Sequence, residues 1–280
     1  MGRDCQLRYC TGCGLELRKT MNKLTFLILL FILPSVAIGI EWHEVQMRKK
    51  IISAFGREIP KEWGQRVKGV KTRLTTDQKV LALTFDACGG IKGNGYDAGL
   101  IKYLESEKVS ATLFMSGKWI DANRNTVKAL ARNPLFEIEN HGLNHKPCSV
   151  NGRSIYGIKG TRSVDELIDE IEQNGIKIQK LIGRKPKFYR PGTAYCDEIG
   201  VEVAKVLGYE VANFNVLGDA GATYSKNQVK EALLNAPLSS IILIHMNHPE
   251  RETREGIIRA IPELKKRGFK FAQLSEYGLR

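Results

Sequence analysis

The sequence predicts an α/β protein built on a parallel sheet, with its functional groups at the carboxyl ends of the strands. Two observations support this class. From about residue 80, seven short apolar segments typical of buried strands alternate with amphipathic segments typical of helices. Distinctive polar residues also end or closely follow five of these strands, namely Asp86, His141, Arg190, Asp219 and His245.

The expected strands are rich in β-branched and apolar residues. In chain order they are residues 80–86, 110–117, 135–140, 187–190, 210–217, 241–245 and 269–275. Between them, Asp97, Ser163 and Ser225 are suitable helix caps, the last two followed three residues later by Glu or Gln. Gly208 and Gly268 are placed to end two of the helices.

The spacing of these segments is that of βα units. Seven strands in about 195 residues give one strand and one helix every 28 residues or so, which favours a parallel sheet. The strand count alone fits both an open sheet and a barrel. In α/β barrels the active site forms at the carboxyl ends of several strands, which is where the five polar residues fall.

Two histidines add a possible metal site. His141 and His145 are four residues apart, a spacing that places two imidazoles on one side of a helical turn and suits a divalent ion such as zinc. Gly142, Asn144 and Pro147 argue against a long helix here, although a single turn is enough.

Five motifs together resemble the polysaccharide deacetylases, also called the NodB homology domain. They are TFDACGG, HGLNH, RPGTAY, NVLGDA and ILIHM, in the order and spacing of that family over about residues 78–275. The resemblance implies a distorted (β/α)7 barrel with its active site at the carboxyl ends of the strands. It also implies a hydrolase that removes N-linked or O-linked acetyl groups from carbohydrates, with acetylated amino sugars of an envelope or extracellular polysaccharide as the expected substrate.

The same resemblance implies a role for each motif residue. Asp86 matches the base that deprotonates the attacking water, and Arg190 matches the arginine that orients it. His141 and His145 match the ligands of a divalent metal, for which Zn²⁺ is expected and Co²⁺ is an alternative.

Two further residues and one loop complete the set that the family implies. His245 matches the general acid that protonates the leaving group, and Asp219 matches its carboxylate partner. A backbone N–H within residues 192–194 is expected to stabilise the oxyanion, since the matching loop does so in the family.

One departure from the family concerns the metal. The position after the base usually holds a second aspartate that binds the ion, and here it is Ala87. Metal affinity should therefore be weaker, because a charged ligand is missing. Cys88 is the alternative ligand, but neighbouring side chains of an extended segment point in opposite directions, which favours water over Cys88.

The N-terminal part divides into three segments. Residues 24–33, LTFLILLFIL, follow Lys19 and Lys23, so residues 21–39 are expected to be a signal peptide cleaved after Gly39 or an uncleaved membrane anchor. Residues 1–20 are expected to be a non-native upstream extension, because Met21 is a natural start. Residues 40–77 are a leader to the deacetylase domain at 78–280.

Export follows from this reading and bears on the cysteines. A periplasmic or extracellular location, with membrane contact only through an uncleaved N-terminal segment, is expected. In such an oxidising compartment Cys148 and Cys196, which both follow site motifs, are candidates for a disulfide that leaves Cys88 free.

Composition limits the partners. With 42% hydrophobic and 26% charged residues, the chain is long enough for one sizeable core. Its net charge of +13 suits an anionic polymer, but the basic residues are scattered and form no nucleic-acid-binding module. Nucleic acid is therefore not an expected partner, and a polysaccharide or peptidoglycan is.

Two other functions fit parts of the sequence. A pseudoenzyme that binds glycan without hydrolysing it would explain Ala87. A glycoside hydrolase would use Asp86 and Asp219 as a carboxylate pair but would leave the histidines without a role. Trp119, Tyr156 and Tyr195 are candidates for stacking on sugar rings, although aromatic residues in barrels more often serve packing.

Overall fold

The computed structural model describes residues 45–280. The predicted extension at 1–20 and the signal or anchor segment at 21–39 lie outside these residues. The chain forms two units, residues Met1–Lys50 and Ile51–Arg280. Residues 45–50 of the first unit are helical, and all that follows concerns the second unit. None of the helices within 45–280 has both the length and the hydropathy needed to cross a bilayer.

Strands and helices alternate along the second unit, as the sequence predicts. The first half contains β1 (Val80–Ala87), α2 (Ala98–Ser106), β2 (Ala111–Met115), α3 (Gly117–Ala122), α4 (Arg124–Leu130), β3 (Phe136–Asn140), β4 (Ser154–Ile155), β5 (Ile158–Lys159) and α5 (Val164–Ile182). The second half contains β6 (Phe188–Tyr189), α6 (Glu198–Val206), β7 (Glu210–Val211), β8 (Val216–Leu217), α7 (Lys226–Leu234), β9 (Ile241–His245), α8 (Thr253–Lys266), β10 (Lys270–Phe271) and a 3₁₀ turn at Leu274–Glu276.

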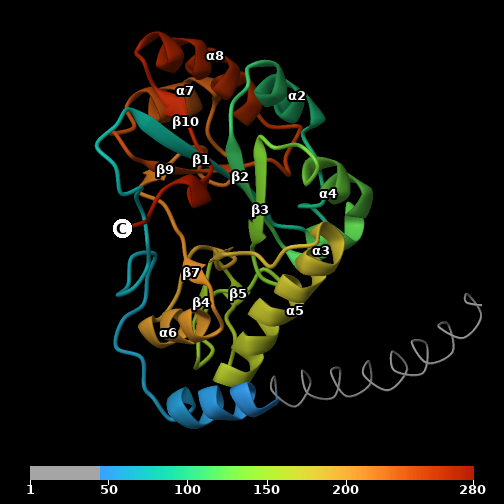
Figure 1. Cartoon of the computed structure of the whole chain (residues 1–280), viewed down its shortest axis with the longest axis vertical. Coiled ribbons are helices and arrows are strands. Elements are labelled where there is room, and N and C mark those ends of the chain that lie inside the picture. The colour runs from blue at the N-terminus through green and yellow to red at the C-terminus, as the bar shows by residue number, and fades with distance from the viewer. Residues whose placement is uncertain (1–44) are drawn as a thin grey trace, which may run out of the picture. The chain divides into compact units, whose positions relative to one another are not determined.

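The main sheet is parallel and curled. Its order is β7-β6-β3-β2-β1-β9-β8, and β10 pairs with the start of β1. Figure 1 shows α2, α4 and α5 beside β2 and β3, with α7 and α8 next to β1 and β10. This is the α/β architecture of a distorted seven-stranded barrel, which confirms the predicted fold class. The ladder stays open between β7 and β8.

Two of the predicted strands were wrong in detail. Residues 210–217 were expected to be one strand, but they form β7 and β8 at opposite ends of the sheet. Residues 269–275 contribute only the short β10. The chain leaves the ladder at Asn213, whose side-chain amide donates to the carbonyl oxygens of Gln65 and Ala194 at 2.7 and 2.8 Å. The sheet therefore has eight strands, seven along the main path from β7 to β8 and β10 beside β1.

The N-terminal segment of this unit lies across the opening in the sheet. Lys71 forms a bridge with Ala212, next to β7, and Arg73 forms a bridge with Ser240, next to β9. The Lys71 N–H donates to Val211 O at 2.9 Å, and the Asn213 N–H donates to Lys71 O at 2.8 Å. The two bridges, with these hydrogen bonds, tie the segment before β1 to the end of β7 and the start of β9.

Side-chain alternation along β1 separates two apolar clusters. Odd-numbered residues from Leu81 to Ala87 pack in an outer cluster with the helices. Val80 and Ala82 pack in an inner cluster inside the curled sheet, together with side chains of β2, β6 and β9. Because side chains of a strand alternate between its two faces, Asp86 continues the inner row and reaches the open end of the sheet.

The helix caps that the sequence indicates are present. Asp97 accepts the Leu100 N–H at 2.9 Å, and Ser225 forms a complete capping box with Gln228. Ser163 accepts the Glu166 N–H at 3.2 Å, but the Glu166 carboxylate binds Arg162 and Lys146. Between β2 and β3 the chain forms two short helices, α3 and α4, which meet at Asn123.

Candidate functional site

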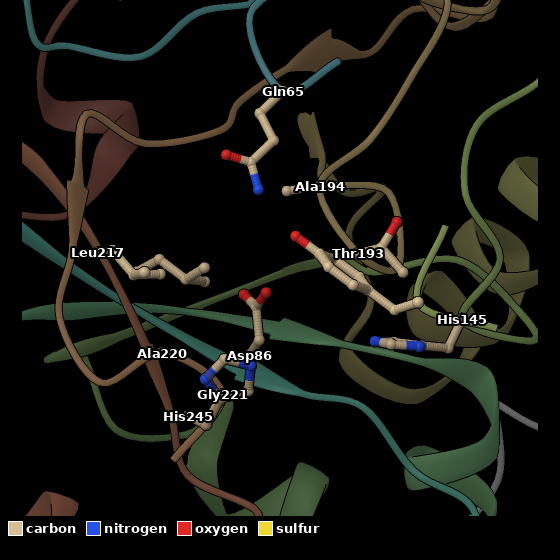
Figure 2. A pocket seen from close by; sticks show the side chains of 11 residues that line it. Gln65, Asp86, His145, Thr193, Ala194, Leu217, Ala220, Gly221 and His245 are labelled. Carbon is tan, nitrogen blue, oxygen red and sulfur yellow. The ribbon is translucent and has the colours of Figure 1, made fainter. Parts of the chain in front are cut away.

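A cavity of about 400 Å³ opens at the carboxyl ends of the strands. Figure 2 shows the Asp86 carboxylate pointing into it, with Leu217 on one side and His145 on the other. The lining residues are Gln65, Asp86, His145, Tyr156, Thr193, Ala194, Leu217, Ala220, Gly221, Leu243 and His245. The sequence therefore placed the site at the correct end of the sheet.

Asp86 and Arg190 form a buried ion pair at the base of this cavity. Arg190 Nη1 donates to Asp86 Oδ1 at 2.7 Å, and the arginine is fully buried. Burial opposes the charged form of Asp86, but Arg190, His141 and His245 outweigh it and hold the pKa of the carboxyl below its usual range. Asp86 is thus a carboxylate at neutral pH, and its Oδ2 is directed away from Arg190.

Two other nitrogen atoms of Arg190 donate to the backbone between β7 and β8. Nε donates to Ala212 O at 2.9 Å and Nη2 to Asn213 O at 3.2 Å. The guanidinium also lies 4.1 Å above the centre of the Phe114 ring. Because these contacts leave the guanidinium little freedom, they fix the orientation of Asp86.

His141 presents one ring nitrogen to the site. Its Nδ1 donates to Arg190 O at 2.9 Å, which leaves Nε2 as the acceptor and potential metal ligand. Nε2 lies 3.5 Å from Asp86 Oδ2 and 3.8 Å from Cys88 Sγ. Burial lowers the pKa of His141, so the imidazole is neutral, as a metal ligand must be.

His145 reaches the same point without the helical turn that its spacing suggested. Residues 141–145 are not helical, and His145 has a left-handed φ of 61°. The two imidazole rings nevertheless lie 4.8 Å apart and nearly perpendicular. The backbone of His145 also explains why residue 192 is a glycine, since an added Cβ there would lie 2.2 Å from the carbonyl carbon of His145.

Glu170 holds the histidine loop in place and was not identified from the sequence. It lies on α5, is 2% exposed, and accepts the N–H groups of Asn144 and Lys146 at 2.8 and 3.0 Å. It also contacts Gly142, where an added Cβ would lie 2.6 Å from Glu170 Oε1. The only sequence signal was a carboxylate on the apolar face of a helix.

Cys88 lies beside the two histidines, although the alternation of side chains was expected to point it away from them. Ala87 packs in the outer cluster, and Cys88 returns to the inner side two residues after Asp86. The prediction compared Cys88 with its direct neighbour Ala87, whose side chain points to the opposite face. The two-residue period of an extended chain instead places Cys88 on the same face as Asp86. Ser116 fixes the loop, because its hydroxyl donates to Cys88 O at 2.6 Å.

Cys88, His141 and His145 form a donor set that fits a metal ion. Their ligand atoms lie within 4.8 Å of one another. Burial opposes the thiolate, but His145 and His245 lower the pKa of Cys88 to about 6. One thiolate and two imidazoles suit zinc or cobalt rather than magnesium or calcium, which prefer oxygen ligands.

His245 and Asp219 form a second hydrogen-bonded pair. His245 Nδ1 donates to Asp219 Oδ1 at 2.8 Å, and the His245 N–H donates to Oδ2 at 2.7 Å. Burial opposes a protonated imidazole, but Asp219 raises the pKa of His245 well above its ordinary value. Thr253 also donates to Asp219, so this carboxylate is fully engaged and is not placed to act on a glycosidic bond.

The loop at residues 192–194 borders the cavity opposite His245. The Gly192 N–H donates to Lys146 O and the Ala194 N–H to Pro191 O. Thr193 and Ala194 both have left-handed backbones, with φ of 94° and 59°. The Thr193 N–H takes part in neither of these two hydrogen bonds.

The other cysteines and aromatic residues are placed as follows. Cys148 and Cys196 are neighbours in a parallel bridge, yet both are free thiols, so the expected disulfide is not formed. Trp119 is fully buried and serves packing. Tyr156 lines the cavity and contacts Tyr195.

Comparison with known proteins gives a consistent assignment. The family model for polysaccharide deacetylases matches residues 73–212. A peptidoglycan-N-acetylglucosamine deacetylase of Bacillus cereus is 26% identical over 211 residues, covering 74% of this chain and 92% of the relative. The peptidoglycan-N-acetylmuramic acid deacetylase PdaA of Bacillus subtilis is 24% identical over 209 residues, which cover 72% of this chain and 72% of the relative.

Two solved structures show the same fold. A family 4 acetyl xylan esterase from Clostridium thermocellum, in complex with a cobalt ion, has a TM-score of 0.58 and 26% identity, with 71% of this chain and 89% of that chain covered. A CE4 family pseudoenzyme from Bacillus anthracis has a TM-score of 0.62 and 21% identity, with 74% and 68% covered.

The role of Glu170 in the histidine loop can be tested directly. We expect Glu170→Ala to lower the free energy of unfolding by about 1–3 kcal/mol, because two partly buried N–H groups lose their acceptor. Urea denaturation measures this change. Gln173→Ala, at an exposed position on the same helix, is the control and should change stability little. Equal stability of both variants would show that Glu170 does not support the loop.

Proposed function

This chain belongs to the polysaccharide deacetylase family, and we propose that it is a metal-dependent hydrolase that removes acetyl groups from N-acetylated amino sugars of a cell-envelope or extracellular polysaccharide. The observation that carries the proposal is the meeting of two different pairs at one cavity. Asp86 with Arg190 supplies an ionised base, and His245 with Asp219 supplies a protonated acid. Both relatives described above act on peptidoglycan, which is therefore the first substrate to test.

Asp86 acts as the general base in this proposal. Its Oδ1 is held by Arg190, so Oδ2 is the oxygen that accepts the proton of the attacking water. The low pKa of Asp86 keeps this oxygen unprotonated at neutral pH before the reaction. Arg190 compensates the charge before the proton arrives and keeps the carboxylate in one orientation.

His245 acts as the general acid. Its Nδ1–H is bound to Asp219, so Nε2 carries the proton that is given to the departing sugar nitrogen. We assign the Thr193 N–H as the donor to the oxyanion, because the Gly192 and Ala194 amides are engaged. Acid and oxyanion donor then lie on opposite sides of the cavity.

We propose that Cys88, His141 and His145 hold a divalent ion, with Zn²⁺ or Co²⁺ as the candidates. The thiolate takes the place of the carboxylate that Ala87 lacks, and it restores one negative charge to the donor set. When bound, such an ion lowers the pKa of water and polarises the acyl oxygen.

The cellular setting is part of the proposal. The apolar segment at residues 24–33, preceded by lysines, supports export to the periplasm or the exterior, with or without an uncleaved anchor. An exported enzyme meets cell-wall glycan there, and a net charge of +13 favours approach to an anionic polymer.

A glycan-binding pseudoenzyme is the second candidate. Ala87 favours it, because a side-chain methyl cannot bind metal, and one structural neighbour is itself a pseudoenzyme. The presence of two hydrogen-bonded pairs, one with an ionised carboxylate and one with a protonated imidazole, favours the enzyme, since binding alone requires neither a base nor an acid. Metal content and acetate release separate the two candidates.

Acetate release from N-acetylated peptidoglycan and chitin oligomers tests the proposal. We expect release by the full chain with zinc or cobalt and little after chelation. Asp86→Asn should lower the rate by about 10²–10⁴-fold, the usual contribution of a general base. His141→Ala should abolish metal dependence by removing a ligand.

The control for these variants is Asp121→Asn, which changes an exposed carboxylate on α3. Its rate should equal that of the parent protein. Absence of release on every substrate, together with absence of bound metal, would favour the pseudoenzyme instead.

Cobalt spectroscopy tests the thiolate ligand. The Co²⁺-loaded protein should show near-ultraviolet thiolate-to-cobalt charge-transfer absorption that is lost in Cys88→Ala and kept in Cys148→Ala. Zinc affinity of Cys88→Ala should fall by more than about tenfold, because even outer partners of metal ligands contribute that much. Unchanged absorption in Cys88→Ala would mean that water, not Cys88, completes the site.

The pH profile tests the acid pair. His245 must be protonated to act as the acid, so activity is lost as pH rises through its pKa. Since Asp219 raises that pKa, Asp219→Asn should lower it and move the alkaline limb of kcat/KM to lower pH. Circular dichroism checks that the variant is folded. An alkaline limb at the same pH as in the parent protein would exclude His245 as the acid.

A further inference from the structure

A second hollow lies at the other end of the sheet from the reaction cavity. Phe136 begins β3 and Lys187 directly precedes β6, so the hollow borders the amino ends of these strands, whereas His141 and Arg190 follow their carboxyl ends. Its volume is about 500 Å³. The polar side chains that line it and matter here are Arg132, Glu137, Arg184, Lys187, Gln273 and Ser275.

Three cationic side chains meet at this hollow, and two of them have no ion pair. Arg132, in the turn after α4, and Lys187, in the segment before β6, are exposed and pair with no carboxylate of residues 45–280. Lys187 instead lies 5.2 Å from the centre of the Phe188 ring. Arg184 pairs with Glu139 at 2.9 Å but is 45% exposed and still borders the hollow. Positive charge from two distant parts of the chain is therefore concentrated here.

The carboxylates beneath the hollow are engaged by internal donors. Glu139 Oε1 binds Arg184, and its Oε2 accepts the Lys187 N–H at 2.7 Å. Glu137 is 5% exposed, and its Oε2 accepts the Thr112 hydroxyl at 2.8 Å. Burial, with the nearby Glu137 carboxylate, raises the pKa of Glu139 to about 7, so Glu139 carries only part of a negative charge at neutral pH. These two groups thus cancel only part of the positive charge.

Uncharged donors complete the lining. Ser275 is exposed, and its hydroxyl has no hydrogen-bond partner within residues 45–280. The Gln273 amide donates one hydrogen to Pro134 O at 2.7 Å, which leaves its second hydrogen for a ligand. Guanidinium and ammonium groups without a carboxylate partner, beside neutral donors, match the oxygens of a phosphate group.

We propose that this hollow is a binding site for a phosphate group, held by Arg132, Arg184 and Lys187. The site contains none of the groups assigned to catalysis, so the proposal is independent of the deacetylase activity. Its ligand is either free inorganic phosphate or a phosphate of a phosphodiester polymer, which present the same oxygens. A polymer bound here leaves the reaction cavity open, and the net charge of +13 favours its approach.

Calorimetric titration of the full chain with inorganic phosphate, at constant ionic strength, tests the site. We expect saturable binding that weakens about 10-fold or more in the double variant Arg132→Gln/Lys187→Gln, because two charge-assisted hydrogen bonds are lost. The matched control is Arg57→Gln/Lys102→Gln, which removes the same two charges at exposed positions outside the hollow. The control should bind phosphate as the parent protein does.

A parallel titration with poly(glycerol phosphate) identifies the source of the phosphate. Tighter binding per phosphate of this polymer than of the free ion assigns the hollow to a polymer, and binding of the free ion alone assigns it to inorganic phosphate. Both results support the site when the Arg132→Gln/Lys187→Gln variant loses them and the control keeps them. No saturable binding of either probe by the parent, or equal affinity of this variant and the parent, would overturn the proposal. Circular dichroism checks that both variants are folded.

Discussion

The ion pair between Asp86 and Arg190 is the interaction on which the rest of the site depends. Two buried charges are costly unless they are paired and hydrogen-bonded, and Arg190 binds Asp86 and two carbonyl groups and lies over the Phe114 ring. The carbonyls belong to Ala212 and Asn213, where the chain leaves the ladder after β7. The opening in the barrel thus provides the acceptors that fix the arginine, and the arginine fixes the base.

The two-residue period of β1 then decides which groups join that base. It places Asp86 and Cys88 on the inner side and Ala87 among the helices, so the loss of a carboxylate at position 87 and the presence of a thiol at position 88 are related features. A thiolate is a softer donor than a carboxylate, and it would shift the metal preference of the site toward zinc or cobalt. The Asp86–Arg190 and His245–Asp219 pairs do not depend on that exchange.

Segments outside the sheet position the remaining parts. Glu170 on α5 holds the loop of His145, and Gly192 allows the loop after β6 to approach that histidine closely. The residues before β1 cross the open side of the sheet and bring Gln65 to the cavity. The strained turn of the β4–β5 hairpin adds Tyr156 from the other side. Chemistry therefore comes from the strands, and the shape of the binding surface comes from the connections.

The sequence by itself determined the α/β class, because strand periodicity is a local signal. Polar residues at strand ends are a local signal too, so the sequence also singled out Asp86, His141, Arg190, Asp219 and His245 as candidates, and the structure brings them together at one end of the sheet. Only the tertiary structure decided that residues 210–217 form two strands, since this depends on the acceptors that Arg190 and the segment before β1 require. It also placed Cys88 with the histidines and Glu170 against the loop of His145, because these contacts join parts of the chain that no local pattern relates.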